Sequence, residues 1–215
     1  MNVLVLGGCG FVGSHLVDHL LVSGHKVRVF DCSRETFRAP LKKVDYIHAN
    51  FNDKQMLAEA LNGVDTVCHL ISTTIPSTSN LNPPADVNEN LVNTLHLLEL
   101  MRERSLRRIL FLSSGGTVYG ETESPTVGEE HPLNPISSYG IVKLTIEKYL
   151  NMYHRLYGLE PVIIRPANIY GSRQCHVGVQ GLIGTIVSKL KLGDVSEIWG
   201  DGTVIRDFLH VKDLV

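Results

Sequence analysis

No stretch of this 215-residue sequence comes near the roughly 18–20 consecutive apolar residues that a membrane-spanning helix needs. Neither sign of charge dominates, because 20 Lys and Arg stand against 22 Asp and Glu, a net charge of −2. Such a balance gives no strong positive field, so neither nucleic acid nor a membrane is expected as a partner. With 43% hydrophobic and 20% charged residues, the composition also excludes intrinsic disorder.

Signals for export and for metal binding are scarce as well. The first residues form a short apolar run with no basic segment before it, so a secretion signal is not predicted. The four cysteines are scattered without a CxxC pair, which favours a reduced, cytoplasmic environment. Ten histidines invite a metal hypothesis, but Cys175 and His176 form one adjacent pair without partners and no HExxH spacing occurs. No metal site is predicted.

Short apolar runs alternate with amphipathic stretches through the first 165 residues, which predicts strands and helices in turn. The runs are continuously apolar, as in strands that are covered on both faces of a parallel sheet. We therefore predict an α/β fold with a Rossmann-type doubly wound parallel sheet. The predicted strands are residues 3–6, 26–30, 46–48, 66–71, 108–112 and 161–165, and the predicted helices are residues 11–23, 53–61, 87–104 and 139–157.

The pattern changes after the sixth predicted strand. Residues 169–178 are predicted to be irregular. A helix is predicted for residues 179–192 and a short strand for residues 197–200. We therefore expect one domain over residues 1–165 and an incomplete, smaller second domain over residues 166–215.

Glycines recur where the first strand ends, in Gly7-Gly8-Cys9-Gly10-Phe11-Val12-Gly13. This spacing is typical of a loop that makes a tight turn, lets the backbone approach a pyrophosphate and packs a helix closely. The helix that follows offers free N–H groups and the positive end of its dipole. Asp31, at the end of the second strand, is placed to bind ribose hydroxyls and disfavours a 2′-phosphate. NAD is therefore favoured over NADP, with an ordinary turn residue as the alternative for Asp31.

Tyr139 and Lys143 lie four residues apart at the start of the helix before the sixth strand. This spacing places them on one face of the helix. A lysine cation, with an oxidised nicotinamide nearby, is expected to lower the pKa of the phenol from its reference of about 10. The tyrosine could then act as a base near neutral pH. The alternative is a solvated pair on an exposed helix face.

Several segments together resemble the extended short-chain dehydrogenase/reductase family, and within it the nucleotide-sugar epimerases and dehydratases. The resemblance extends over essentially the whole chain. Each motif alone is common, but their combination in this order is highly specific. The matching segments are residues 7–13, 67–70, 90–94, 113–120, 139–143, 165–171 and 200–214.

The resemblance implies NAD as the cofactor and assigns residues to it. Phe11 and Val12 are expected to donate backbone N–H groups to the pyrophosphate. Asn50 stands beside the adenine where the family usually has Asp, and an amide can also contact the ring. The residues after the fourth strand are expected on the nicotinamide side. The cofactor-binding residues implied in this way are Gly7, Gly10, Phe11, Val12, Gly13, Asp31, Asn50, Phe51, Leu70, Ile71, Ser72, Tyr139, Lys143 and Pro166.

The resemblance also implies a catalytic set, with one departure. Asn90 matches a helix asparagine that supports the active-site backbone and a bound water. Gly115 stands where family members usually carry a catalytic Ser or Thr, and glycine has no hydroxyl. A neighbour must supply it, and we expect Thr117 to face the sugar and Ser114 the nicotinamide ribose. The expected catalytic residues are Tyr139, Lys143, Thr117, Ser114 and Asn90.

The implied activity is that of an NAD-dependent nucleotide-sugar 4-epimerase of the UDP-glucose/UDP-galactose type. Tyr139 would take the proton of the 4-hydroxyl, hydride would pass from C4 to NAD and return to the other face of the sugar. The dehydratases carry an Asp-Glu pair at the positions of Gly116 and Thr117, and the decarboxylases usually carry a Glu at the position of Thr117. Both reactions are therefore less favoured than epimerisation. A dehydratase, decarboxylase or reductase, and a non-catalytic NAD-binding sensor, stay as alternatives.

On the substrate side, the resemblance implies that Asn168 binds the phosphates or the sugar and that Arg206 pairs with the diphosphate. A surface ion pair with Asp207 or a nearby acid is the alternative for Arg206. Thr117 and Tyr139 complete the expected substrate contacts. A homodimer packed through the Tyr139 helix is implied as well. Because family members run on well beyond this length, the chain is expected to be a piece of a longer protein that binds NAD but turns over sugars poorly.

Overall fold

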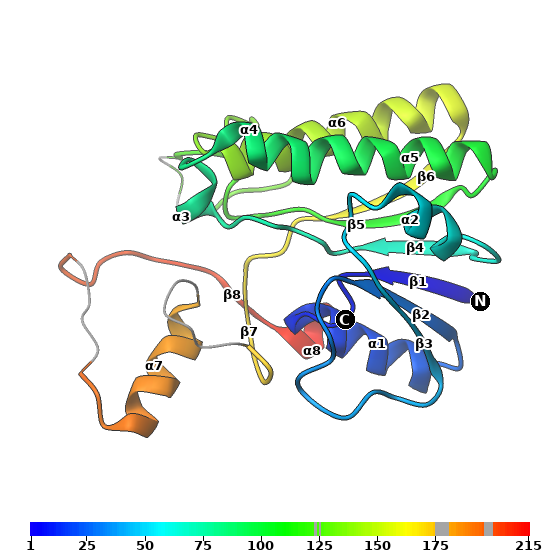
Figure 1. Ribbon diagram of the computed structural model, residues 1–215. Coiled ribbons are helices and arrows are strands. Elements are labelled where there is room, and N and C mark those ends of the chain that lie inside the picture. The colour runs from blue at the N-terminus through cyan, green and yellow to red at the C-terminus, as the bar shows by residue number, and fades with distance from the viewer. Residues whose placement is uncertain (123, 125, 175–180, 196–199) are drawn as a thin grey trace.

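The structure, a computed structural model, describes residues 1–122, 124, 126–174, 181–195 and 200–215. Its centre is a six-stranded sheet in the order β3-β2-β1-β4-β5-β6, in which all neighbours are parallel (Figure 1). This order confirms the predicted Rossmann-type doubly wound sheet. The strands are β1 (Asn2–Leu6), β2 (Lys26–Asp31), β3 (Val44–His48), β4 (Thr66–His69), β5 (Arg108–Leu112) and β6 (Glu160–Ile164).

Helices cover both faces of the sheet. α1 (Phe11–Val22) packs on one face, whereas α2 (Lys54–Ala60), α5 (Asn93–Glu103) and α6 (Ser138–Tyr157) pack on the other (Figure 1). Because each interior strand is covered on both sides, its residues are apolar without alternation. The chain therefore has two hydrophobic clusters, one on each face of the sheet.

Strand β1 shows how one strand serves both clusters. Leu4 and Leu6 point into the cluster below α2, α5 and α6, whereas Val3 and Val5 point into the cluster below α1. All four side chains are at most 2% exposed. Since the burial of such a side chain contributes about 1.5–3 kcal/mol, both faces of the strand favour apolar residues.

The helix predicted over residues 87–104 is divided in the structure. Two short helices, α3 (Pro76–Ser79) and α4 (Pro83–Asp86), precede a π-helical turn at Val87–Val92, and α5 begins only after it. Such wide turns are rare and occur often at functional sites. The apolar spacing of the sequence carries no sign of the turn, because the residues on both sides of it keep an ordinary helical period.

Beyond β6, the prediction of an irregular segment is wrong at its start. β7 (Asn168–Tyr170) pairs in parallel with β8 (Phe208–His210) in a separate two-stranded sheet. Local periodicity cannot reveal this pairing, because the two strands are far apart in the sequence. The second strand leads into α8 (Val211–Leu214), which packs beside α1.

The predicted helix over residues 179–192 is found from residue 182 onward, as α7 (Leu182–Leu192). In Figure 1 this helix stands apart from the six-stranded sheet. The strand predicted at residues 197–200 lies outside the described residues except for Gly200, and so do Cys175 and His176. The division of the chain at residue 165 stays a prediction.

No helix in the described part of the chain has the length and apolar content needed to cross a bilayer. Among the same residues, Cys9, Cys32 and Cys68 are free thiols. These residues also contain no group of three side chains that could hold a metal ion.

Candidate functional site

The loop between β1 and α1 is built around its glycines. Gly7 has a φ of +83°, which favours glycine, and its carbonyl accepts a hydrogen bond from the Gly10 N–H (3.2 Å). A Cβ atom on Gly13 would overlap the Gly7 carbonyl, so only glycine lets α1 begin this close to the loop. The first-turn amides of α1, at Phe11 and Val12, lack intrahelical acceptors. They are the donors that a pyrophosphate requires.

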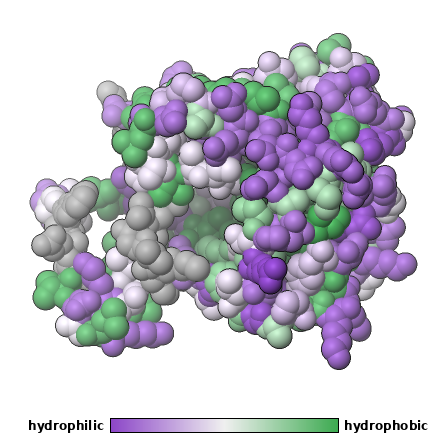
Figure 2. All heavy atoms as spheres, in the orientation of Figure 1, coloured by the Kyte–Doolittle hydropathy of each residue, from purple (hydrophilic) through white to green (hydrophobic). Residues whose placement is uncertain are grey.

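The end of β4 lies directly against this loop. The Leu70 N–H donates to the Leu6 carbonyl (3.0 Å), and a Cβ atom on Gly7 would lie 3.2 Å from the Ile71 nitrogen. The strand order reverses between β1 and β4, and ligands of open α/β sheets bind in the crevice at such a point. Figure 2 shows the surface hollowed in this region, with apolar side chains on the floor of the hollow.

At the end of β2, the carboxylate of Asp31 turns toward the same loop. One oxygen accepts from the Cys9 N–H (3.0 Å) and the other from the Ser33 N–H (2.8 Å). Each oxygen keeps a lone pair for a ribose hydroxyl, and the negative charge opposes a 2′-phosphate. These residues fit the adenosine and pyrophosphate part of NAD, with the amides of Phe11 and Val12 and the Asp31 carboxylate as the groups that would hold it.

The two residues expected beside the adenine have different surroundings. Asn50 is exposed in the loop after β3, where its carbonyl accepts from the Asp53 N–H (2.9 Å). Phe51 is 8% exposed, and its ring packs on His69 with 5.1 Å between the centroids. Phe51 therefore contributes to the core beneath the crevice, and Asn50 to its outer edge.

On the other side of the crevice, α6 presents Tyr139 and Lys143. The hydroxyl of Ser137 caps the helix by accepting from the Gly140 N–H (3.2 Å). The Lys143 ammonium donates to the Leu112 carbonyl (2.9 Å) and lies 5.6 Å from the centre of the Tyr139 ring. Complete burial lowers the pKa of Lys143 to about 8. The lysine is thus a buried group, which excludes the solvated helix pair.

In the chain by itself, the pKa of Tyr139 is raised. Burial raises it above 10, because the phenolate loses its hydration, and the carboxylate of Asp86 adds to the rise. Hydrogen bonds with the hydroxyls of Ser72 and Ser114 oppose this rise. The lowering of this pKa by Lys143 together with an oxidised nicotinamide stays a prediction.

The serine segment explains why residue 115 is glycine. The Gly115 N–H donates to the Pro166 carbonyl (2.9 Å), and a Cβ atom there would lie 2.8 Å from the Arg165 carbonyl oxygen. A hydroxyl at this position has no room. The Ser114 hydroxyl lies near enough to the phenol to lower the pKa of Tyr139, whereas Thr117 Oγ1 is buried without a hydrogen-bond partner in the described part of the chain. Of the two candidate hydroxyls, the structure brings Ser114 to Tyr139.

Asn90 lies in the π-helical turn, where all of its polar atoms are engaged. Its Oδ1 accepts from the Thr73 N–H (2.9 Å), and its Nδ2 donates to the Thr73 hydroxyl (2.9 Å) and to Asp86 Oδ1 (2.9 Å). Asn90 therefore holds the backbone after β4, which carries Ser72. Asp86 and the contact between Ser72 and the phenol escaped the sequence reasoning, because both depend on contacts between segments far apart in the chain.

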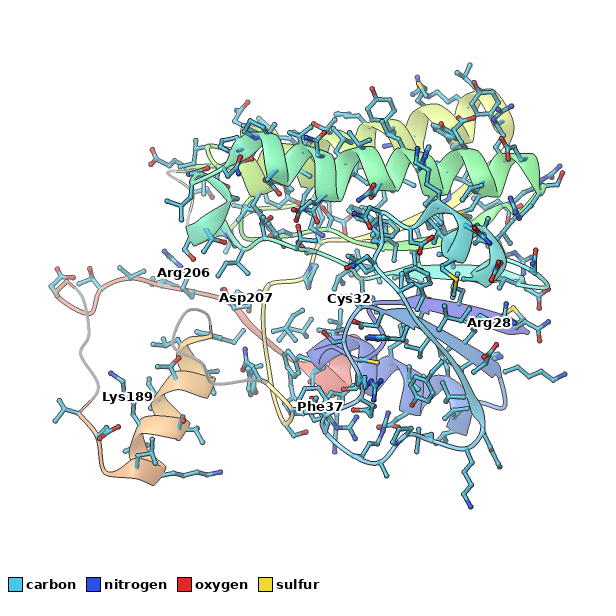
Figure 3. The ribbon with its side chains drawn as sticks, in the orientation of Figure 1. Arg28, Cys32, Phe37, Lys189, Arg206 and Asp207 are labelled. Carbon is cyan, nitrogen blue, oxygen red and sulfur yellow. The ribbon has the colours of Figure 1, made fainter. Side chains whose placement is uncertain are left out.

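Of the expected substrate residues, Asn168 and Arg206 line a second cleft, of about 800 Å³, that reaches Gly115, whereas Thr117 and Tyr139 do not line it. Asn168 donates from its side chain to the Asp207 carbonyl (2.9 Å), and the Arg206 guanidinium donates to the Ile205 carbonyl (2.8 Å). Arg206 and Asp207 lie on the segment that leads to β8 (Figure 3). Within the described ranges no ion pair joins Arg206 to Asp207 or another acid, so the surface-pair alternative is absent there.

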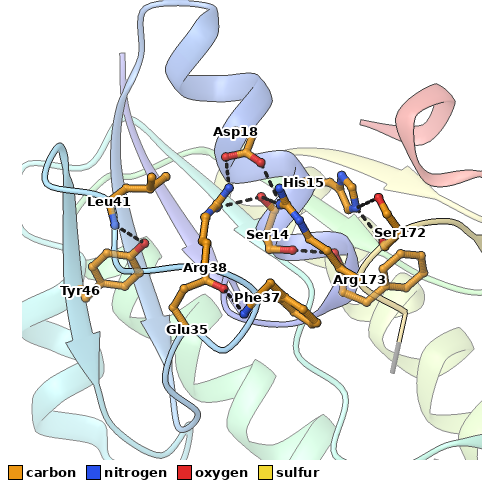
Figure 4. Close-up of polar contacts among 11 residues, drawn as sticks. Ser14, His15, Asp18, Glu35, Phe37, Arg38, Leu41, Tyr46, Ser172 and Arg173 are labelled. Carbon is orange, nitrogen blue, oxygen red and sulfur yellow. Dashed lines mark hydrogen bonds and ion pairs between the residues drawn. The ribbon is translucent and has the colours of Figure 1, made fainter. Parts of the chain in front are cut away.

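A cluster that the sequence did not indicate ties the ribose side to the segment after β7 (Figure 4). Asp18 on α1 pairs with Arg38 of the β2–β3 loop and with Arg173 (2.8 Å). Both arginines also donate to the Ser14 carbonyl, at 3.2 Å and 3.0 Å. His15 bonds the Ser172 carbonyl one residue away (2.9 Å). One face of α1 thus binds both the β2–β3 loop and the segment after β7.

Comparison with known proteins gives a consistent result. Residues 3–215 match the model of the NAD dependent epimerase/dehydratase family. UDP-glucose 4-epimerase of Mycolicibacterium smegmatis is 36% identical over 100% of this chain and 71% of its own length. The crystal structure of UDP-glucose 4-epimerase with UDP-glucose from Thermotoga maritima superposes with a TM-score of 0.93 at 33% identity, over 100% of this chain and 71% of that one.

Two further matches bear on cofactor and reaction. The structure of Thermus thermophilus UDP-glucose 4-epimerase in complex with NAD superposes with a TM-score of 0.89 at 32% identity, over 100% of this chain and 72% of that one. UDP-glucuronic acid decarboxylase 1 of Danio rerio is 30% identical over 100% of this chain and 52% of its own length. Proteins named for different reactions thus share this scaffold.

Proposed function

Because the chain belongs to the NAD dependent epimerase/dehydratase family, an extended short-chain dehydrogenase/reductase family, we propose that it is a nucleotide-sugar 4-epimerase of the UDP-glucose/UDP-galactose type. The observation that carries the proposal is the buried Tyr139–Lys143 pair across the crevice from the glycine loop, with the hydroxyls of Ser72 and Ser114 near the phenol. The similarity to epimerases from two bacteria, at 33% and 36% identity, supports the same reaction.

In this proposal the chain binds the cofactor and the sugar, orients them and transfers one proton. The amides of Phe11 and Val12 and the carboxylate of Asp31 would hold the cofactor, and Ser72 and Tyr139 are the residues expected on its nicotinamide side. When bound, NAD accepts a hydride from C4 and returns it, so none is consumed. Tyr139 accepts the proton of the sugar 4-hydroxyl and gives it back.

Ser114 is the hydroxyl that we assign to the sugar, in place of Thr117. Its hydroxyl lies near enough to the phenol to lower the pKa of Tyr139, so it is placed to contact a 4-hydroxyl bound there. The Thr117 hydroxyl is buried and has no such effect on the phenol. Lys143, held by the Leu112 carbonyl, supplies positive charge behind the phenol.

For the rest of the substrate, the cleft lined by Asn168 and Arg206 is the proposed diphosphate side. A guanidinium that has no acidic partner among the described residues is suited to a diphosphate, because its forked donors match the phosphate oxygens. Its one protein contact is the neighbouring Ile205 carbonyl in the described ranges, so the head of the side chain needs little rearrangement.

The second candidate is a decarboxylase or dehydratase on the same scaffold, which the match to the Danio rerio decarboxylase favours. These reactions need an acidic group close to C5 and C6 of the sugar. By resemblance that group belongs at the positions of Gly116 and Thr117, and neither residue can ionise at neutral pH. The epimerase proposal therefore has the stronger support.

The oligomeric state and the location in the cell are proposals as well. The apolar α6 positions Leu144, Ile146, Leu150 and Tyr153 suit a dimer interface and a core equally by their spacing, and Ile146, Leu150 and Tyr153 are at most 5% exposed and belong to the core. Ile141 and Leu156 are more than half exposed on the same helix. We propose a homodimer through this outer face of α6, in the cytoplasm, and measurement of the molar mass in solution tests the dimer.

A panel of nucleotide sugars tests the proposed reaction. The purified protein, with added NAD, is incubated with each sugar, and the products are identified by mass spectrometry and chromatography. We expect interconversion of UDP-glucose and UDP-galactose, and loss of it in Tyr139→Phe. The matched control is Tyr157→Phe, an exposed tyrosine at the other end of α6. NAD binding without turnover of any sugar would instead support the non-catalytic sensor.

A further inference from the structure

A carboxylate that is completely buried lies behind the proposed catalytic pair. Asp86, the last residue of α4, has no exposed surface. Its Oδ1 accepts from the Thr74 hydroxyl (2.6 Å) and from Asn90 Nδ2 (2.9 Å), and its Oδ2 accepts from the Ser138 hydroxyl (2.6 Å). Buried charges require such partners, and here three different segments supply them.

These donors connect the two sides of the phenol. Thr74 belongs to the segment after β4 that carries Ser72, whose hydroxyl donates to the Thr74 carbonyl (3.0 Å) and lies near enough to the phenol to lower the pKa of Tyr139. Ser138 precedes Tyr139 in the chain. Two further bonds hold the same helix end, since the Tyr139 N–H donates to Ser79 Oγ (3.1 Å) and the Ser138 N–H to Asn80 Oδ1 (2.8 Å). Asp86 therefore joins two segments through its hydrogen bonds: the segment after β4, which carries Ser72, and the first turn of α6, which carries Tyr139.

The carboxylate also acts through its charge, because little water separates it from the pair. It raises the pKa of Tyr139 and that of Lys143. The other charged group that raises the pKa of Lys143 is Glu147 on α6, and Arg165 engages it in an ion pair (2.6 Å). His69 on β4 also faces Lys143, but burial lowers its pKa to about 3, so the ring is neutral.

Asp86 thus differs from Glu147 in its partners. Its three hydrogen-bond donors are neutral, and in the described ranges no lysine, arginine or histidine forms an ion pair with it. A negative charge without a paired cation exerts its field on the nearest groups that can change charge, and these are Tyr139 and Lys143.

We propose that Asp86 is a positioning residue for the Tyr139 base, which fixes the segment after β4 and the first turn of α6 around the phenol and places a buried negative charge behind the Tyr139–Lys143 pair. The use of Tyr139 as the base rests on the proposed function, whereas the effect of Asp86 on the phenol does not depend on turnover.

Two substitutions separate the charge from the geometry. Asp86→Asn has the same shape, and its Oδ1 can accept from Thr74 and Asn90 while its Nδ2 donates to the Ser138 hydroxyl, which can act as an acceptor. It removes the charge and keeps the hydrogen bonds. Ser138→Ala removes one hydrogen bond and keeps the charge.

The test is an ultraviolet titration of tyrosinate in the protein saturated with NAD. Subtraction of the Tyr139→Phe titration isolates Tyr139 from the other tyrosines. We expect the midpoint to fall by about one pH unit in Asp86→Asn, the size of a buried charge effect, and to stay in place in Ser138→Ala. Both variants are expected to lower turnover of UDP-galactose, but only the first moves the pH profile.

The proposal is overturned when Asp86→Asn leaves the midpoint unmoved or raises it, or when Ser138→Ala moves it equally. Asp86→Ser is the second uncharged variant if the asparagine variant does not fold, and it should show the same fall with a larger loss of turnover. Failure of the proposed function gives a different result, because the midpoint then moves as expected while no nucleotide sugar is converted.

Discussion

Single residues in the site are determined by neighbours that are remote in sequence. Gly115 is the clearest case, because it is surrounded by the carbonyls of Arg165 and Pro166. The family pattern calls for a hydroxyl there, and the chain places one at Ser114 instead. Sequence alone favoured Thr117 for the sugar and Ser114 for the nicotinamide ribose, because it does not show which of the two hydroxyls lies near Tyr139.

Replacement of Gly115 tests this packing. Gly115→Ser places a Cβ atom 2.8 Å from the Arg165 oxygen and 2.9 Å from the Pro166 oxygen, so we expect a loss of about 1–3 kcal/mol in the free energy of unfolding. The measurement is urea unfolding followed by circular dichroism. Gly116→Ser is the control, because nothing lies within 4 Å of a Cβ atom there, and it should change stability by less than about 0.5 kcal/mol. Equal stability of the two variants would contradict the account.

The burial of Lys143 gives a pH-dependent prediction. Its pKa is about 8 in the folded chain and 10.5 when unfolded, so between these values the unfolded state binds more protons. The cost of the buried charge is therefore complete below pH 8 and disappears as the pH rises to 10.5. We expect Lys143→Met to gain stability relative to the wild type at pH 7, and to lose that gain by pH 10.

The control for this experiment is on the same helix. Lys148 is exposed on α6, and Lys148→Met should leave the pH dependence of the unfolding free energy as it is in the wild type. Unfolding of all three proteins is followed in urea at several pH values. A difference between Lys143→Met and wild type that does not change with pH would show that the lysine is not held as a buried charge.

At the scale of elements, the sequence pattern predicts those structures that depend on residues close together in the chain. Short apolar stretches marked the six strands of the main sheet, most clearly β1 and β4, which are buried in its interior, and least clearly β3 at its edge. The glycine loop was recognisable since its spacing follows from one turn. The pairing of β7 with β8 and the π-helical turn around Asn90 were not, because both depend on partners that the sequence pattern does not identify.

Besides following the glycine loop, helix α1 binds two other segments through Asp18, and the contribution of these ion pairs to stability can be measured. Asp18→Ala leaves Arg38 and Arg173 without their shared carboxylate. The pairs are partly exposed, so we expect a loss of about 1 kcal/mol in stability, reduced by high salt. Hydrogen exchange should become faster in residues 171–174. The control is Asp45→Ala, which breaks a more exposed pair with Arg28 and should leave exchange in that segment unchanged.

At the scale of the whole molecule, two halves of one crevice come together at the reversal of strand order. The glycine loop and Asp31 stand on one side, and Tyr139, Lys143 and Ser114 on the other. The order of strands was predictable from the βαβ alternation. The lack of room at residue 115 and the charge of Asp86 behind the phenol were not, because they arise only when distant segments pack.

The central claim is that this chain epimerises a nucleotide sugar by transient oxidation at C4, with Tyr139 as the base. The most direct measurement uses UDP-galactose that carries deuterium at C4, incubated with the protein and NAD. We predict that the UDP-glucose formed keeps the deuterium at C4, and that Tyr139→Phe forms it at least about 100-fold more slowly. Loss of the deuterium to water, or equally fast conversion by Tyr139→Phe, would contradict the account.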